Sequence, residues 1–262
     1  MRTCDNFASS ANVSFVLKGD DQVGFARDSE SMSIQGLQFP ELRLLQITDS
    51  AFPSGSFAFS YGLESMAKLG RIRDVSDFRK FLLNVLAQIS FSEIPFLNSS
   101  YHCASDEHGP LIAIIERLDA YITTPCIRKA SVTQGRSLLL GVKAVYPEQN
   151  FDQFAQWLLL HELPTHYAPI FGVVARTIGI GHLQALCAYL YIALRDQVSA
   201  AIRLGLVGPF EGHGILRQTF EQVGANVSRV KDLEYHQAFK IAAALEIAQA
   251  YHPKLYSHLF QN

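Results

Sequence analysis

The side chains that could carry out chemistry in this chain include nine histidines and four cysteines, and their spacing predicts no reaction. The phosphate-binding pattern G-x-x-x-x-G-K-[ST] is absent. Gly179-Ile-Gly181 follows an expected helix rather than a strand, so it indicates a helix end and not a dinucleotide site. No G-x-S-x-G elbow occurs, and nothing singles out a nucleophile with its base. We therefore expect no cofactor and no enzymatic activity, with a helical hydrolase as a weaker alternative.

A metal ion is the other reactive group that these side chains could hold. His102, Cys103 and His108 lie close together in one expected loop. Imidazole and thiolate suit both Zn²⁺ and Ni²⁺. His161 and His166 are five positions apart with a proline between them, so they do not form a helical i, i+4 pair. Ordinary loop and capping roles are the default, and we assign no metal ligand. A protein that carries nickel directly stays open as the alternative.

Acidic side chains show no paired arrangement either. Glu41, Asp49 and Glu64 are interpreted as helix caps and surface groups. The 22 basic and 24 acidic residues give a net charge of -2, without a dense basic run, so nothing favours nucleic-acid binding.

Composition places the chain among globular proteins. Its 262 residues are 48% hydrophobic and 18% charged, which is enough apolar material for a sizeable core. No apolar run is long enough for a membrane span, and the first ten residues do not resemble a signal peptide. The cysteines are widely scattered, which fits reduced thiols. We expect a cytoplasmic protein.

The elements that would position these residues are helices. Apolar residues recur at helical spacing along most of the chain after Pro40, most clearly from Phe78 to Ile89, where Asp74 is the expected N-cap. The pattern predicts a single all-α bundle of about ten helices, including residues 115–121, 127–145, 151–160, 166–178, 182–203, 215–223 and 232–251.

Both ends of the chain differ from this helical part. Residues 1–38 are rich in Ser, Asn, Asp and Gly and are expected to form a flexible extension, followed by a helical domain at 39–251. The tail 252–262 carries Tyr256, Leu259 and Phe260 beyond the last expected helix. Large apolar side chains in such a tail either pack back on their own domain or anchor a partner.

Four sequence blocks resemble the UreF family of urease accessory proteins and cover residues 41–262. The first, Asp49-Ser-Ala-Phe-Pro-Ser-Gly-Ser-Phe-Ala-Phe-Ser-Tyr-Gly-Leu-Glu64, is similar to the family's opening signature over 16 positions. The others are Arg128–Leu139, His166–Gly172 and Val198–Pro209, in the family's order. Across these blocks, the residues that we take as the family's signature residues are Asp49, Pro53, Gly55, Gly62, Glu64, Arg128, Ser131, Gly135, Arg136, Arg203 and Gly205. Ser56, His213 and His258 depart from the family's pattern, and residues 1–38 lie outside the family core.

The resemblance implies a non-catalytic, all-helical chaperone that forms a homodimer within a larger complex. Such a protein binds a UreD-type accessory protein, also called UreH, and recruits and regulates the GTPase UreG. The complex then inserts nickel into apo-urease. The resemblance also implies that Tyr256, Leu259 and Phe260 contact the UreD-type partner. Nucleotide chemistry would then belong to UreG, in agreement with the missing phosphate loop.

Overall fold

The computed structural model describes residues 39–103 and 109–261, which fold into α-helices joined by short turns. No strand occurs in this part of the chain, which confirms the all-α prediction. The expected extension 1–38 and His108 lie outside the described residues. The helices are α1 (Pro40–Thr48), α2 (Leu63–Lys68), α3 (Val75–Ser92), α4 (Ile94–His102), α5 (Gly109–Tyr121), α6 (Pro125–Val145), α7 (Phe151–Leu160), α8 (Tyr167–Thr177), α9 (His182–Arg203), α10 (Pro209–Gln218), α11 (Phe220–Val230) and α12 (Ala243–Tyr251).

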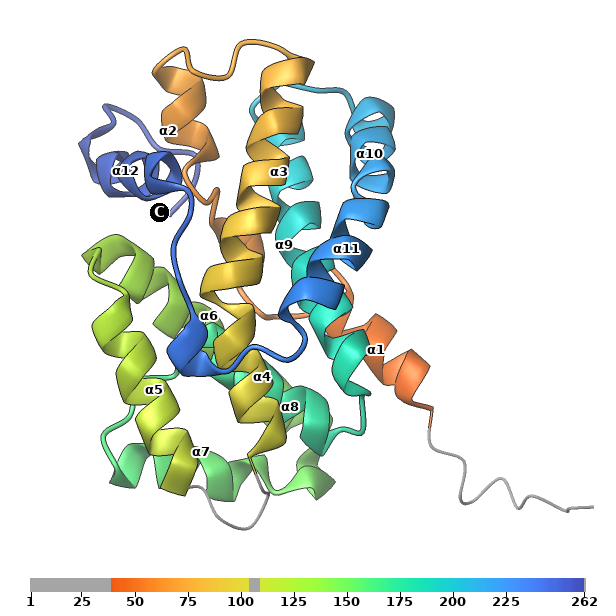
Figure 1. Cartoon of the computed structure of the whole chain (residues 1–262), viewed down its shortest axis with the longest axis vertical. Helices are drawn as coiled ribbons and strands as arrows, with labels where there is room; N and C mark the ends of the chain where they lie inside the picture. Colours follow the sequence, from red (N-terminus) through yellow and green to blue (C-terminus); the bar gives the residue numbers. More distant parts are fainter. Residues whose placement is uncertain (1–38, 104–108, 262) are drawn as a thin grey trace, which may run out of the picture. The chain divides into compact units, whose positions relative to one another are not determined.

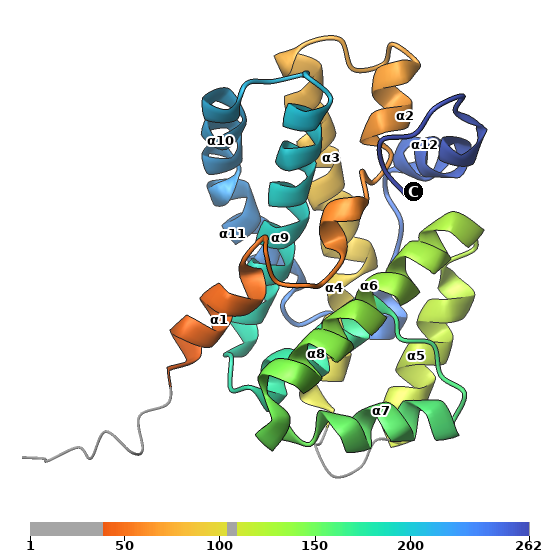
Figure 2. The ribbon, with the colours of Figure 1, turned by 180° about the vertical axis from the view of Figure 1, so that it is seen from behind.

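Two long helices, α3 and α9, pack against each other in the core and lie side by side in both views (Figures 1 and 2). Helix α3 begins as predicted, because the Asp74 carboxylate accepts a hydrogen bond of 2.8 Å from the N–H of Asp77. The predicted apolar stripe of α3 from Phe78 to Ile89 is buried, and so are the leucines on one face of α9. Burial of these two stripes supplies much of the apolar area that stabilises the fold.

The expected loop from His102 to Pro110 is wrong at both of its ends, which belong to helices. Helix α3 ends at Ser92, and α4 begins at Ile94 with Pro95 in its first turn, where a missing backbone N–H costs nothing. His102 is therefore the last residue of α4, and Gly109 already begins α5.

The expected helix at 215–223 is also wrong, since two helices meet there. Helix α10 ends at Gln218 and α11 starts at Phe220. The hydroxyl of Thr219 donates a 2.7 Å hydrogen bond to the carbonyl of Leu216, which satisfies a group at the end of α10.

The expected long helix at 232–251 is replaced by an irregular stretch that precedes α12. The Gln88 side-chain oxygen accepts hydrogen bonds from the N–H groups of Ile241 and Ala242 at 2.9 and 2.8 Å. The Asn98 amide donates to the carbonyls of Val230 and Leu233. Polar side chains of α3 and α4 thus satisfy backbone groups that a helix would otherwise pair.

The described helices include no candidate for a membrane span. None of them combines the length with the apolar character that a span requires.

Candidate partner-binding site

The C-terminal segment is bound to its own domain by a buried carboxylate in the first turn of α2. Glu64 is 0% exposed. Its Oε1 accepts hydrogen bonds of 2.8 Å from the N–H of Leu259 and from Lys68 Nζ. Its Oε2 accepts from the N–H of Phe260 at 3.2 Å and from His252 Nε2 at 3.0 Å. The interpretation of Glu64 as a cap or surface group is therefore wrong, because three of its four partners, in His252, Leu259 and Phe260, lie 188 to 196 positions away and leave no local sequence signal.

Hydrogen bonding keeps the Glu64 carboxylate charged. Burial alone would raise its pKa, but the hydrogen bonds from Lys68, Leu259 and His252 outweigh this effect and lower the pKa to about 2. A buried charge that satisfies two backbone N–H groups holds the segment far more firmly than an exposed ion pair would.

Phe260 is held on the other side by Arg203, at the end of α9. The guanidinium carbon of Arg203 lies 3.7 Å from the ring centre of Phe57 and 4.1 Å from that of Phe260, so it is placed against both rings. Arg203 Nη2 also donates to the carbonyl of Phe57 at 2.7 Å. The N–H of Gln261 donates to the carbonyl of Ala58 at 2.9 Å. Two signature residues that are far apart in sequence, Glu64 and Arg203, thus both contact Phe260.

The three predicted tail residues have different environments. Phe260 is only 5% exposed, whereas Leu259 is 54% exposed and Tyr256 is fully exposed. The segment follows α12 and folds back toward α2 (Figure 1). In this conformation Phe260 contacts its own domain, and Tyr256 and Leu259 are the residues available to a partner.

Most of the other signature residues of this part of the chain shape the backbone. Gly62 has a φ of +88°, and a Cβ there would lie 3.1 Å from the Cβ of Ala248 in α12, so glycine is needed for both reasons. Gly205 has a φ of +70° and follows the end of α9, a position that favours glycine. Asp49, Pro53 and Gly55 lie in the turn after α1, where the Asp49 carboxylate accepts from the N–H of Ala51 at 2.7 Å.

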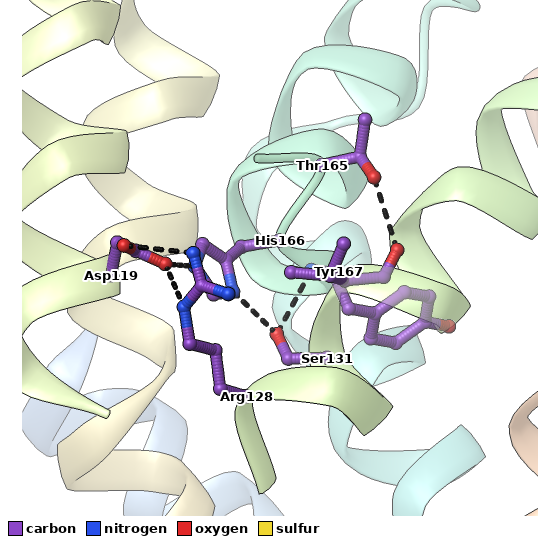
Figure 3. A network of polar contacts seen from close by, with 7 residues as sticks. Asp119, Arg128, Ser131, Thr165, His166 and Tyr167 are labelled. Atoms are coloured by element: carbon purple, nitrogen blue, oxygen red, sulfur yellow. Dashed lines mark hydrogen bonds and ion pairs between the residues drawn. The ribbon is translucent and has the colours of Figure 1, made fainter. Parts of the chain in front are cut away.

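A second group of signature residues meets between α5, α6 and α8 (Figure 3). His166 is fully buried and lies between Asp119 Oδ1, 2.9 Å from its Nε2, and Ser131 Oγ, 3.1 Å from its Nδ1. Arg128 binds both oxygens of Asp119, at 2.6 and 3.0 Å. Burial lowers the pKa of His166, and the bond to Asp119 only partly opposes this.

Close packing of α6 explains the small residues in this group. A Cβ at Gly135 would lie 1.9 Å from the carbonyl oxygen of Thr165, a distance that no side chain allows. The hydroxyl of Thr165 donates to the carbonyl of Val132 at 3.0 Å. Ser131 and Gly135 therefore lie on the face of α6 that the backbone just before α8 approaches closely. Arg136, on the same helix, is exposed to solvent.

Ser131, His166 and Asp119 together have the residue types of a hydrolytic triad, but their surroundings suit a structural role. Asp119 is paired with Arg128 through both oxygens, which reduces the negative charge that would stabilise a protonated His166. Burial raises the pKa of Asp119, but its hydrogen bonds lower it below the ordinary value. Ser131 Oγ also accepts from the N–H of Tyr167 at 3.3 Å, which lowers its reactivity as a nucleophile. The network ties three helices together.

A cavity of about 90 Å³ adjoins Ser131, and its lining includes Tyr61 and Glu93. The Glu93 carboxylate accepts hydrogen bonds from Tyr61 at 3.0 Å and from Tyr189 at 2.5 Å. Burial raises the pKa of Glu93, although the two tyrosine hydrogen bonds oppose this rise. The volume is large enough for a few water molecules.

The candidate metal ligands are not assembled in the described part of the chain. No three His, Cys, Asp or Glu side chains gather there in a way that could hold a metal ion. The ring of His102 instead contacts that of His182, with 4.5 Å between their centres, and His182 Nε2 is 2.9 Å from Asn98 Oδ1.

Several residues of these networks were missed from the sequence. Asp119 and His252 have no local pattern that marks them, because each meets its partners only through tertiary packing. Phe57 lies within the Asp49–Glu64 block, but nothing in the sequence shows its contact with Arg203. Lys68 could have been found, since it lies four positions after Glu64 on the same helix.

Comparisons with known proteins identify the family of this chain. A family model described as UreF matches residues 72–219. The chain is 31% identical over 219 residues to "Urease accessory protein F" of Oryza sativa subsp. japonica, covering 82% of each chain. It is 30% identical over 218 residues to the protein of the same name from Arabidopsis thaliana, covering 82% of this chain and 90% of that one. It is 29% identical over 226 residues to "Urease accessory protein UreF" of Trichodesmium erythraeum, covering 85% and 97%. The chain therefore belongs to the UreF family of urease accessory proteins.

Proposed function

We propose that this chain is a non-catalytic scaffold for nickel insertion into apo-urease. It binds a UreD-type (UreH) protein, recruits the GTPase UreG and regulates it, and forms a homodimer within that complex in the cytoplasm. Nickel is the cargo of the complex, and the chain itself needs no cofactor.

One observation carries the proposal: signature residues of the family hold polypeptide segments in place. Glu64 and Arg203 bind the C-terminal segment, and Arg128 and Ser131 join α5, α6 and α8 through Asp119 and His166. Because these side chains are engaged in structural contacts, the protein is suited to presenting a binding surface. Such a surface can orient partner proteins relative to one another.

Regulation of UreG needs only differential binding. A scaffold that binds one nucleotide state of a GTPase more tightly than another shifts the balance between the two states, and no reactive group on the scaffold is required. Such a role fits a helical bundle with exposed apolar residues, such as Tyr256 and Leu259, beside a rigid core.

Co-purification tests the proposal. The tagged chain, expressed in a urease-competent host, should recover the UreD-type protein and, with it, UreG. GTP hydrolysis by the purified chain alone should equal the buffer background, and hydrolysis by UreG should change when both accessory proteins are added. Recovery of neither partner, or GTP turnover by the chain alone, would contradict the proposal.

A further inference from the structure

We infer that Glu64 and Arg203 are positioning residues that display the C-terminal segment to a partner protein whose groove is apolar and rimmed by carboxylates. This inference rests on the proposed scaffold function and adds how the surface is built and what chemistry it fits.

The Glu64 carboxylate is saturated with donors from three different segments. A carboxylate accepts about four hydrogen bonds. The four that Glu64 accepts come from Lys68, His252 and the consecutive N–H groups of Leu259 and Phe260. Two adjacent N–H groups directed at one anion fix the local direction of the backbone. Without the carboxylate, the buried N–H of Phe260 would lose its acceptor.

Arg203 determines which side chain of the segment points inward. Its guanidinium lies against the rings of Phe57 and Phe260, so Phe260 is buried while the neighbouring Leu259 faces solvent. The hydrogen bond from Gln261 to Ala58 secures the same stretch on its far side. Phe260 therefore serves as the internal anchor, and Leu259 is presented outward.

The displayed side of the segment is apolar and cationic. Tyr256 is fully exposed and Leu259 is half exposed, and large side chains of this kind are typical anchors of protein interfaces. Residues 251–262 contain no Asp or Glu, whereas Lys254 and His258 are exposed. Lys68 also binds the carbonyl of Ser257, but its charge is compensated by Glu64. A complementary partner surface is apolar with an acidic rim.

Substitution of the clamp in the full-length chain tests the positioning role. Glu64→Gln places an amide NH₂ against N–H donors, so hydrogen exchange of the Leu259 and Phe260 amides should rise at least tenfold while exchange in α3 stays unchanged. Affinity for the purified UreD-type protein should fall at least tenfold. Glu41→Gln, at an exposed carboxylate in α1, is the matched control and should change neither quantity. Arg203→Lys is the second test, for use if Glu64→Gln fails to fold. It keeps the charge but not the planar group, so amide exchange should rise and affinity should fall here too.

A double-variant comparison separates positioning from other roles of Glu64. The chain that ends at His258 lacks the bound stretch, so adding Glu64→Gln to it should weaken partner capture no further. An equal loss in the shortened and full-length chains would overturn the inference, as would faster amide exchange with unchanged capture. If the unaltered chain captures no UreD-type protein, the proposed function fails, and the exchange of the two amides then decides the clamp by itself.

Charge reversal tests the chemistry of the partner. Lys254→Glu should weaken capture about tenfold and reduce its dependence on salt. Lys129→Glu, at an exposed position on α6, is the control and should leave capture unchanged. If the Lys254→Glu variant and the unaltered chain bind the UreD-type protein with equal affinity, the inference of an acidic rim on the partner is wrong.

Discussion

Glu64 Oε1 accepts a 2.8 Å hydrogen bond from the backbone N–H of Leu259, 195 positions further along the chain. This bond joins the Asp49–Glu64 block to the C-terminal segment. It explains why a short sequence block near the start of the domain contains a glutamate that reaches no solvent, and it makes the C-terminal segment part of the fold.

The contribution of Glu64 to stability should depend on pH. Its folded pKa of about 2 lies below the ordinary value of 4.5, so its stabilisation is present above about pH 4.5 and is lost as the pH falls toward 2. A shift of this size corresponds to about 3 kcal/mol. Urea unfolding should show Glu64→Gln less stable by about 2–3 kcal/mol at pH 7, with a smaller difference near pH 3. A difference that is the same at both pH values would contradict the assignment.

Gly135→Ala should be among the most damaging single changes in the domain. Its Cβ would lie 1.9 Å from the carbonyl oxygen of Thr165, and backbone atoms cannot move aside cheaply. We expect a loss of more than about 3 kcal/mol in the free energy of unfolding. Gly214→Ala, also within a helix but with open space at its Cβ, is the control and should stabilise by about 0.5–1 kcal/mol. Thermal unfolding of the two variants distinguishes them, and similar melting temperatures would refute the close approach.

His166 should remain neutral when ordinary histidines are protonated. Its folded pKa is lowered, mainly by burial, so the unfolded chain takes up the proton first as the pH falls below about 6.5. The domain should therefore lose stability between pH 7 and pH 5, with His182 and His252, whose pKa values are also lowered by burial, acting in the same direction. NMR titration of the His166 ring measures this directly. A pKa of 6.5 or above would show the sign to be wrong.

Ser131→Ala should leave any ester hydrolysis by the purified chain unchanged. The pairing of Asp119 with Arg128 and the hydrogen bond from Tyr167 to Ser131 indicate a structural network, so hydrolysis of activated esters should equal the background for both proteins. Turnover that requires Ser131 would instead establish an enzyme.

Equilibrium dialysis with Ni²⁺ addresses the direct-carrier alternative. The ring of His102 is packed against His182, and no metal cluster is present among residues 39–103 and 109–261. Tight nickel binding that disappears in a His102→Ala, Cys103→Ala variant would favour the carrier. We expect weak binding that these substitutions do not change.

Helical periodicity predicted the core better than the connections. The stripe from Phe78 to Ile89 and the full length of α9 were found because apolar residues at 3.6-residue spacing mark a buried face directly. The segment before α12 was wrongly predicted to be helical. The side chains that bind its backbone groups, Gln88 and Asn98, lie on distant helices, so the local sequence does not reveal them. Helix propensity and the spacing of apolar residues do not predict such contacts.

The candidate site was predictable in part for the same reason. Resemblance to a family identified Glu64 and Arg203, but only the structure shows that both bind the tail. The tail itself was expected either to pack back or to anchor a partner, and its residues divide between these roles: Phe260 is buried and Tyr256 is exposed.

The nickel content of urease made without this chain tests the scaffold account most directly. In a urease-competent host that lacks its gene of this family, purified urease should be present as protein but largely free of nickel and inactive. Expression of this chain should restore both nickel and activity. Fully nickel-loaded, active urease in the host without the gene, at ordinary nickel supply, would contradict the account.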